Sequence, residues 1–145
     1  GLPDNSLPEL GGAYGHVLKN IAIDGETLYL SIASPSNANP ADRANDPIRC
    51  AIYAYDLTGG NRRLIANGVR NAEGLAIEPG TNNLWLAVNN RDNIRYPYQG
   101  GPFSFGELNA AYVDDHPPDE LIRVTNGADY GWPYANPNPD SLNGM

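Results

Sequence analysis

The clearest alternation of apolar and polar positions covers residues 20–31, which read NIAIDGETLYLS. Ile21 and Ile23 alternate with smaller residues, and leucines continue the alternation after the pair Asp24-Gly25. A period of two is typical of a β-strand, and an Asp-Gly pair between two such runs supplies a turn that accepts positive φ. Residues 20–31 are therefore predicted to form a β-hairpin.

The same pattern returns in residues 74–89, which read GLAIEPGTNNLWLAVN and carry a turn signal at Pro79-Gly80. The pair AI at 22–23 corresponds to AI at 76–77, and LYL at 28–30 corresponds to LWL at 84–86. The offset of about 54 residues slightly exceeds the roughly 40 to 50 residues of a four-stranded propeller blade, and the polar segment before Ile48 absorbs the difference as a loop. We therefore predict an internal repeat.

Further β segments lie between and after these hairpins. Residues 51–57 (AIYAYDL) and 63–66 flank the turn signal TGGN at 58–61 and are predicted as the third and fourth strands of the first unit. Residues 120–125 (ELIRVT) alternate again and are predicted as a third strand of the second unit. No segment has a sustained helical period, which favours an all-β fold.

These units predict one partial β-propeller domain over residues 1–145, covering about two four-stranded blades, at 14–72 and 73–137. Segments rich in Pro, Gly, Asn and Asp, at 35–46 and 93–118, are expected to be long loops above the sheets. Radial packing closes only with roughly four to eight blades. We therefore expect further blades or a further chain to complete the propeller, and the end at 143–145 is typical of a truncated sequence.

Composition narrows the classes of function. The chain has 145 residues, a formal net charge of -8, 16 glycines and 13 prolines, which suits one domain with many turns. An acidic chain without a basic run is a poor ligand for nucleic acid. No apolar stretch approaches the ~20 residues that cross a bilayer, and no signal peptide is visible. Cys50, the single cysteine, is expected to be a small buried residue at a strand start.

Four motifs occur in order along the chain. They are SPSN at 34–37, GVRNAEGLA at 68–76, LWLAVNNRD at 84–92, and PDELIRV at 118–124 leading to YGWPY at 130–134. On these motifs the chain resembles the glucose/sorbosone dehydrogenase family, and it is most similar to the sorbosone dehydrogenase branch. The resemblance implies a six-bladed propeller, the cofactor pyrroloquinoline quinone (PQQ) with calcium, and a periplasmic or secreted location.

By this resemblance, His16 is the catalytic base, because it precedes the first strand as the family's histidine does. Such a base takes the proton from the anomeric hydroxyl of a sugar while hydride leaves C1 for C5 of the quinone. The chemistry needs a group whose pKa lies near the operating pH, and imidazole meets this need with little tuning. The alternative is an ordinary surface or capping histidine.

Arg70 and Asn71 match the family's RN pair, which implies that they bind PQQ. A guanidinium holds carboxylates and quinone oxygens through paired hydrogen bonds and offsets the negative charge that reduction builds. The alternative is an arginine and an asparagine that end a loop at the propeller face.

The resemblance also implies a calcium ion bound by main-chain carbonyls in residues 89–92, with those of Asn90 and Arg91 as the candidate ligands. Oxygen ligands suit calcium, and main-chain carbonyls place no demand on side-chain identity. The sequence departs from the family here, since the common glycine-proline is absent and Arg91 adds a positive charge.

A second departure concerns the group that orients the base. Ser34 stands where the glucose dehydrogenase branch has an aspartate, and a serine can hydrogen-bond imidazole without stabilising imidazolium by charge. Asp42 and Asp46 are the candidate carboxylates that remain.

Other conspicuous groups are interpreted mainly as structural. Tyr130 and Trp132 are expected to pack between blades, with sugar stacking as the alternative. An acidic cluster flanks His116 and is expected to be a solvated loop face, with cation binding as the alternative. The cluster consists of Asp114, Asp115, Asp119 and Glu120.

Three classes of function remain open. The first is a quinoprotein that oxidises an aldose or sugar aldehyde, of the sorbosone or glucose type, to a lactone or acid and passes electrons to an external acceptor. The second is a non-catalytic propeller for carbohydrate binding or adhesion. The third is a calcium-dependent lactonase-like hydrolase, which would need several carboxylates and asparagines around one axial metal. The context of Arg70-Asn71 favours the first.

Overall fold

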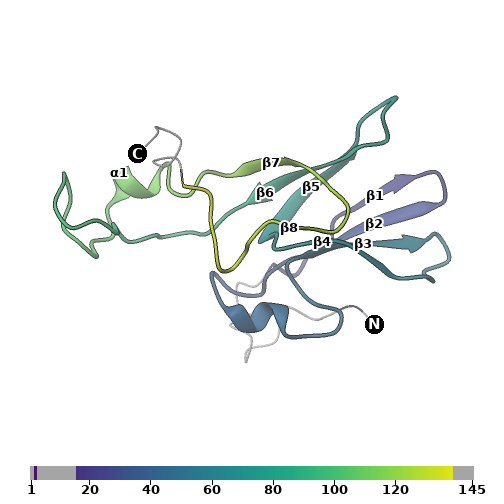
Figure 1. Ribbon diagram of the computed structural model, residues 1–145, viewed down its shortest axis with the longest axis horizontal. Coiled ribbons are helices and arrows are strands. Elements are labelled where there is room, and N and C mark those ends of the chain that lie inside the picture. The colour runs from purple at the N-terminus through teal and green to yellow at the C-terminus, as the bar shows by residue number, and fades with distance from the viewer. Residues whose placement is uncertain (1, 3–15, 139–145) are drawn as a thin grey trace.

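The chain folds into two β-sheets that pack face to face, in a computed structural model that describes residue 2 and residues 16–138 (Figure 1). The first sheet has the strand order β1-β2-β3-β4-β8, and the second has the order β5-β6-β7. In chain order the strands are β1 (Ile21–Asp24), β2 (Thr27–Ile32), β3 (Ala51–Asp56), β4 (Arg63–Asn67), β5 (Asn71–Ile77), β6 (Leu84–Asn89), β7 (Glu120–Arg123) and β8 (Ala128–Asp129). The all-β prediction is confirmed. Residues 14 and 15 of the predicted first blade, and residues 143–145, lie outside the described residues.

The internal repeat is confirmed at the level of strand register. In the first hairpin, Ala22 lies opposite Tyr29, and Ile23 lies opposite Leu28. In the second hairpin the corresponding pairs are Ala76 with Trp85, and Ile77 with Leu84. Both hairpins therefore align the same residue types in the same pairing. Gly25 in the first turn has a φ of 55°, the positive value that its Asp-Gly pair predicts.

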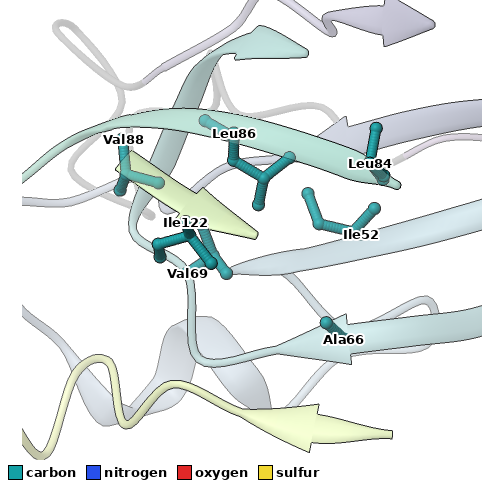
Figure 2. Close-up of a cluster of buried hydrophobic side chains, with 8 residues drawn as sticks. Ile52, Ala66, Val69, Leu84, Leu86, Val88 and Ile122 are labelled. Atoms are coloured by element: carbon teal, nitrogen blue, oxygen red, sulfur yellow. The ribbon is translucent and has the colours of Figure 1, made fainter. Parts of the chain in front are cut away.

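The main core lies between the two sheets (Figure 2). Figure 2 shows Leu84, Leu86 and Val88 along β6, on the side where Ile52 and Ala66 of the first sheet lie. Leu86 and Ile52 are both fully buried, at 0% exposure. Burying a side chain of this size contributes about 1.5–3 kcal/mol, so this interface makes a large contribution to the stability of the chain.

Strand β8 differs from the prediction, which placed residues 73–137 in the second blade. Its residues Ala128 and Asp129 pair in parallel with Ala66 and Asn67 of the first sheet. The second sheet accordingly has three strands among the described residues instead of four, and the segment after β7 returns to the first sheet. Gly68 makes this return possible, since a Cβ at that position would lie 2.9 Å from the main-chain nitrogen of Tyr130.

Both predicted long loops contain one short helix. A 3-10 helix, η3 (Pro40–Arg43), lies in the loop at 35–46, and α1 (Ala110–Val113) lies in the loop at 93–118. Figure 1 shows the loop with α1 extending from the end of the sheets opposite the β1–β2, β3–β4 and β5–β6 turns. None of the helices within the described residues has the length and apolarity needed to cross a membrane.

Candidate functional site

The predicted site residues gather at the end of the sheets where β1 and β5 begin. His16 and Asn71 line one cavity of about 450 Å³, here called the His16 cavity, together with Asn20 and Glu73. Val17 and Leu18 form its apolar wall. The structure therefore brings together the predicted base and one of the two predicted cofactor ligands. A volume of this size lies within the range of small-molecule sites.

The imidazole of His16 is oriented by the main chain. Its Nδ1 lies 2.7 Å from the carbonyl oxygen of Ser34. Because a carbonyl only accepts hydrogen bonds, Nδ1 carries the proton, and the lone pair of the neutral ring lies on Nε2. This is the tautomer that a general base requires.

Burial is the main influence on the basicity of His16. It lowers the pKa of the imidazole below the ordinary value of 6.5, and the bond to Ser34 acts in the opposite direction. The positive charge of Arg70 also lowers this pKa, whereas the carboxylates of Glu73 and Asp92 raise it. The ring is therefore neutral, and able to accept a proton, at neutral pH.

The side chain of Ser34 has a different role from the one expected. Its hydroxyl donates to Oδ2 of Asp42 at 2.8 Å, and the hydroxyl of Ser36 donates to the same oxygen at 2.7 Å. Asp42 thus fixes the loop that presents the Ser34 carbonyl to His16. The other candidate carboxylate, Asp46, forms an exposed ion pair with Arg62 at 2.7 Å. The carboxylates that act on the imidazole are instead Glu73 and Asp92.

Arg70 is 2% exposed and is not among the residues that line the His16 cavity. Its guanidinium donates five hydrogen bonds, to Asn37, Asn89 and Asp92. It also lies over the ring of Trp132, with 5.5 Å between Cζ and the ring centroid. Arg70 therefore ties together three segments that are distant in sequence. Direct contact with a cofactor stays a prediction and would compete with these bonds.

The main chain of Ser34 links the two predicted functional groups. Its nitrogen donates to the carbonyl oxygen of Arg70 at 2.8 Å, while its own carbonyl accepts from His16. His16 and Arg70 consequently lie at the same end of the sheets, as their proposed shared role requires.

Glu73 is a site residue that the sequence analysis missed. Its Oε1 accepts a hydrogen bond from Nδ2 of Asn71 at 2.9 Å. Alternate residues of a strand share one face, so Glu73 is expected on the same face as the half-buried Leu75 and Ile77. A charged residue on an apolar face was the signal in the sequence that could have identified it. A β-bulge between Ala72 and Gly74 resolves this conflict by leaving Glu73 exposed.

The predicted calcium segment borders a second cavity of about 230 Å³, with Asp114 and Asp119 on its wall. The main-chain oxygen of Asn89 accepts from Arg70, and that of Asp92 accepts from Asn37. These bonds leave the carbonyls of Asn90 and Arg91 as the candidate ligands in this segment. Their oxygen donors fit calcium in kind. The described residues contain no group of three or more His, Cys, Asp or Glu side chains that could hold a metal.

The acidic cluster near His116 serves the loop itself. Asp119 accepts from the main-chain nitrogen of Asn90 at 2.9 Å, and Glu120 accepts from its side-chain amide at 2.8 Å. Asp115 lies 2.6 Å from Nδ1 of His116. The cation-binding alternative for this cluster therefore has no support among the described residues.

The aromatic residues near the end of the described chain are structural, as expected. Trp132 is 2% exposed beneath Arg70, and the hydroxyl of Tyr130 donates to the carbonyl of Arg123 at 3.2 Å. Cys50 is fully buried, which confirms its predicted place in the core, and burial raises the pKa of its thiol.

The comparisons with known proteins concern the fold. No protein-family model matches the chain, and no curated protein matches it by sequence. The chain is similar to the iodide structure of a Trichoderma reesei carbohydrate-active enzyme of family AA12, with a TM-score of 0.64 and 23% identity over 81% of this chain. A calcium structure from Trichoderma reesei family AA12 gives a TM-score of 0.60 and 23% identity over 81% of this chain.

A third similar structure is the holo form of the pyranose dehydrogenase PQQ domain from Coprinopsis cinerea, with a TM-score of 0.58 and 18% identity over 77% of this chain. The chain spans 31%, 31% and 28% of the lengths of the three matched chains. At these identities the likeness is one of fold. The chain therefore shares its fold with part of a PQQ domain.

Proposed function

We propose that this chain forms two blades of a β-propeller quinoprotein that oxidises an aldose or sugar aldehyde of the sorbosone or glucose type. The fold shared with a PQQ domain and with carbohydrate-active enzymes of family AA12 supports this class. The proposed protein is exported to the periplasm or secreted, and further blades complete the propeller.

The single observation that carries the proposal is the tautomer of His16. With Nδ1–H donated to Ser34, Nε2 carries the lone pair at the wall of the His16 cavity. In the proposed reaction Nε2 takes the proton of the anomeric hydroxyl, and the hydride on C1 leaves with both bonding electrons. The carbon–oxygen bond becomes a carbonyl, which gives the lactone.

When bound, PQQ supplies the acceptor for that hydride, and an external acceptor later removes the two electrons. The polar wall of the His16 cavity fits such a group, because the amide of Asn71 lies there beside the base. Asn71 is proposed to bind it directly. Arg70 is proposed to act through its positive charge, and by holding Asn37 and Asp92 in place. The carbonyls of Asn90 and Arg91 are the proposed calcium ligands.

The lactonase-like alternative is less well supported. It needs several carboxylates and asparagines around one axial metal, and the described part of the chain gathers no three His, Cys, Asp or Glu side chains that could supply the carboxylate share of such a site. The non-catalytic alternative differs from the proposed function in one respect that can be measured, since a binding propeller transfers no electrons.

The test uses the longest natural protein that contains this sequence. It is titrated with PQQ and calcium while the reduction of a dye by glucose or sorbosone is followed. We expect reduction that needs both PQQ and sugar. Sugar binding without reduction at any metal concentration would favour the non-catalytic propeller. Hydrolysis of a lactone without reduction would favour the hydrolase.

A further inference from the structure

Glu73 lies in the His16 cavity because of a local irregularity in β5. Along this strand Ala72 pairs with Val88 and Gly74 pairs with Ala87, so Glu73 has no partner across the ladder. A bulge of this kind bends the strand and redirects one side chain. The result is a carboxylate that shares a cavity wall with His16.

Two side chains, one just before β1 and one in β2, hold this bulge in place. Nδ2 of Asn20 donates to the carbonyl of Ala72 at 2.9 Å, and Oγ of Ser31 donates to the same oxygen at 3.2 Å. Asn71 fixes the carboxylate itself through the 2.9 Å bond to Oε1 of Glu73. The position of Glu73 therefore depends on contacts from both sheets.

The charges around His16 differ in how far they are compensated. The charged groups that act on the imidazole are Arg70, Glu73 and Asp92. Asp92 forms an ion pair with Arg70 at 3.2 Å, so the two opposite charges largely cancel at the ring. Glu73 accepts from a neutral amide and forms no ion pair with a described residue, so its negative charge stays uncompensated.

We propose that Glu73 is the positioning carboxylate of the site, which balances the positive charge that His16 acquires when it takes a proton from the substrate. This inference rests on the proposed function, in which His16 is the base. It assigns to Glu73 the charge that Ser34 cannot supply. Glu73 acts through His16 and needs no contact with the reacting atoms.

The test measures His16 directly, without cofactor or substrate. An NMR titration of the longest natural protein that contains this sequence follows the assigned ring carbons and nitrogens of His16, and the curve of His116 is an internal reference. Glu73→Gln keeps an oxygen that can accept from Asn71 and removes the charge. We expect the pKa of His16 to fall below the wild-type value in E73Q and the curve of His116 to stay unchanged.

Two further variants make the result specific. Glu73→Asp keeps the charge on a shorter side chain, and we expect its His16 pKa to lie above that of E73Q. Glu26→Gln removes an exposed carboxylate from the β1–β2 turn, at the opposite end of the sheet, and should leave His16 unchanged. Equal His16 titrations in E73Q and wild type would overturn the proposal, as would an E26Q shift as large as that of E73Q.

The two proposals fail in different ways. If the titration shifts as expected and the natural protein reduces no dye, Glu73 still acts on His16 and the sugar oxidation is wrong. If dye is reduced and the His16 titration is unchanged in E73Q, the oxidation stands and the role of Glu73 is wrong.

Discussion

The carbonyl oxygen of Ser34 accepts a hydrogen bond from Nδ1 of His16 at 2.7 Å. This contact fixes both the orientation and the tautomer of the ring, although Ser34 is 18 residues away in sequence. The same serine is buried and anchored through its hydroxyl to Asp42. The main chain thus performs the orienting task for which a side-chain carboxylate was expected.

Replacing His16 with glutamine tests its proposed role as base. The side-chain amide of glutamine can still donate to the Ser34 carbonyl, but it cannot accept a proton at neutral pH. We expect His16→Gln to slow sugar oxidation by about 10² to 10⁴, the usual effect of losing a general base, with little change in PQQ affinity. Stopped-flow reduction and a PQQ titration separate the two quantities. His116→Gln is the control and should keep the wild-type rate, because that ring stacks on Tyr112 in the long loop.

The lowered pKa of His16 predicts a pH dependence of stability. Below 6.5 the unfolded chain binds a proton at this residue more readily than the folded chain does, because burial disfavours the imidazolium. The free energy of unfolding should therefore fall as pH decreases from 6.5 through the lower pKa of the folded state. Urea denaturation at a series of pH values measures this change in the free energy of unfolding. The His16→Gln variant should lose less stability than wild type over that interval, and an equal loss in both would contradict the expected pKa direction.

The repeat could be predicted from the sequence because its determinants are local. Alternating apolar positions and the Asp24-Gly25 turn define the first hairpin. The same alternation and the Pro79-Gly80 turn define the second. Strand β8 could not be predicted, since it spans two residues and is held by a parallel pairing with β4. Glu73 was missed for a related reason. The bulge that exposes it depends on bonds from Asn20 and Ser31, which are distant in sequence.

The burial of Arg70 also could not be predicted from the sequence. The RN pair predicted a guanidinium directed at a cofactor. That contact stays a prediction. Within the chain the guanidinium's partners are Asn37 in the loop after β2, Asn89 at the end of β6 and Asp92 in the loop that follows, and their convergence is a property of the folded chain. A motif identifies only which residue type stands at a position. How many of the guanidinium's hydrogen-bond donors remain available for a ligand depends on these distant segments.

Replacing Arg70 with alanine should therefore destabilise the fold. The variant removes five hydrogen bonds, and the half-buried Asn89 loses the donor to its side-chain oxygen. Leaving buried acceptors unsatisfied costs about 1–3 kcal/mol, which urea denaturation can measure. Arg62→Ala is the matched control, because its ion pair with Asp46 is exposed and contributes less than about 1 kcal/mol. Equal losses in the two variants would show that the Arg70 network adds no stability.

Asp42 should be more sensitive to substitution than its position in a polar loop suggests. It is 3% exposed and accepts from the hydroxyls of Ser34 and Ser36. Asp42→Ala removes the acceptor of the Ser36 hydroxyl and one of two acceptors of the Ser34 hydroxyl, the other being the main-chain oxygen of Ser36. We expect a loss of about 1–3 kcal/mol in the free energy of unfolding. It should also broaden or shift the NMR signals of the His16 ring, because Ser34 loses its bond to the Asp42 carboxylate. Asp46→Ala, which alters an exposed residue of the same loop, should change neither quantity.

Gly68 should be the glycine least tolerant of alanine among those of the first sheet. It has a φ of 70°, and an added Cβ would collide with the side chain of Asp129 and lie 2.9 Å from the nitrogen of Tyr130. Gly68→Ala therefore combines backbone strain with displacement of β8, and we expect a loss above about 1 kcal/mol. Gly25→Ala is the matched control, since Gly25 has a φ of 55° and open space around its Cβ position. The difference between the two variants in the free energy of unfolding, measured by urea denaturation, reports the contribution of the close contact between β8 and β4. Equal losses would mean that the parallel pairing of these strands contributes nothing to stability.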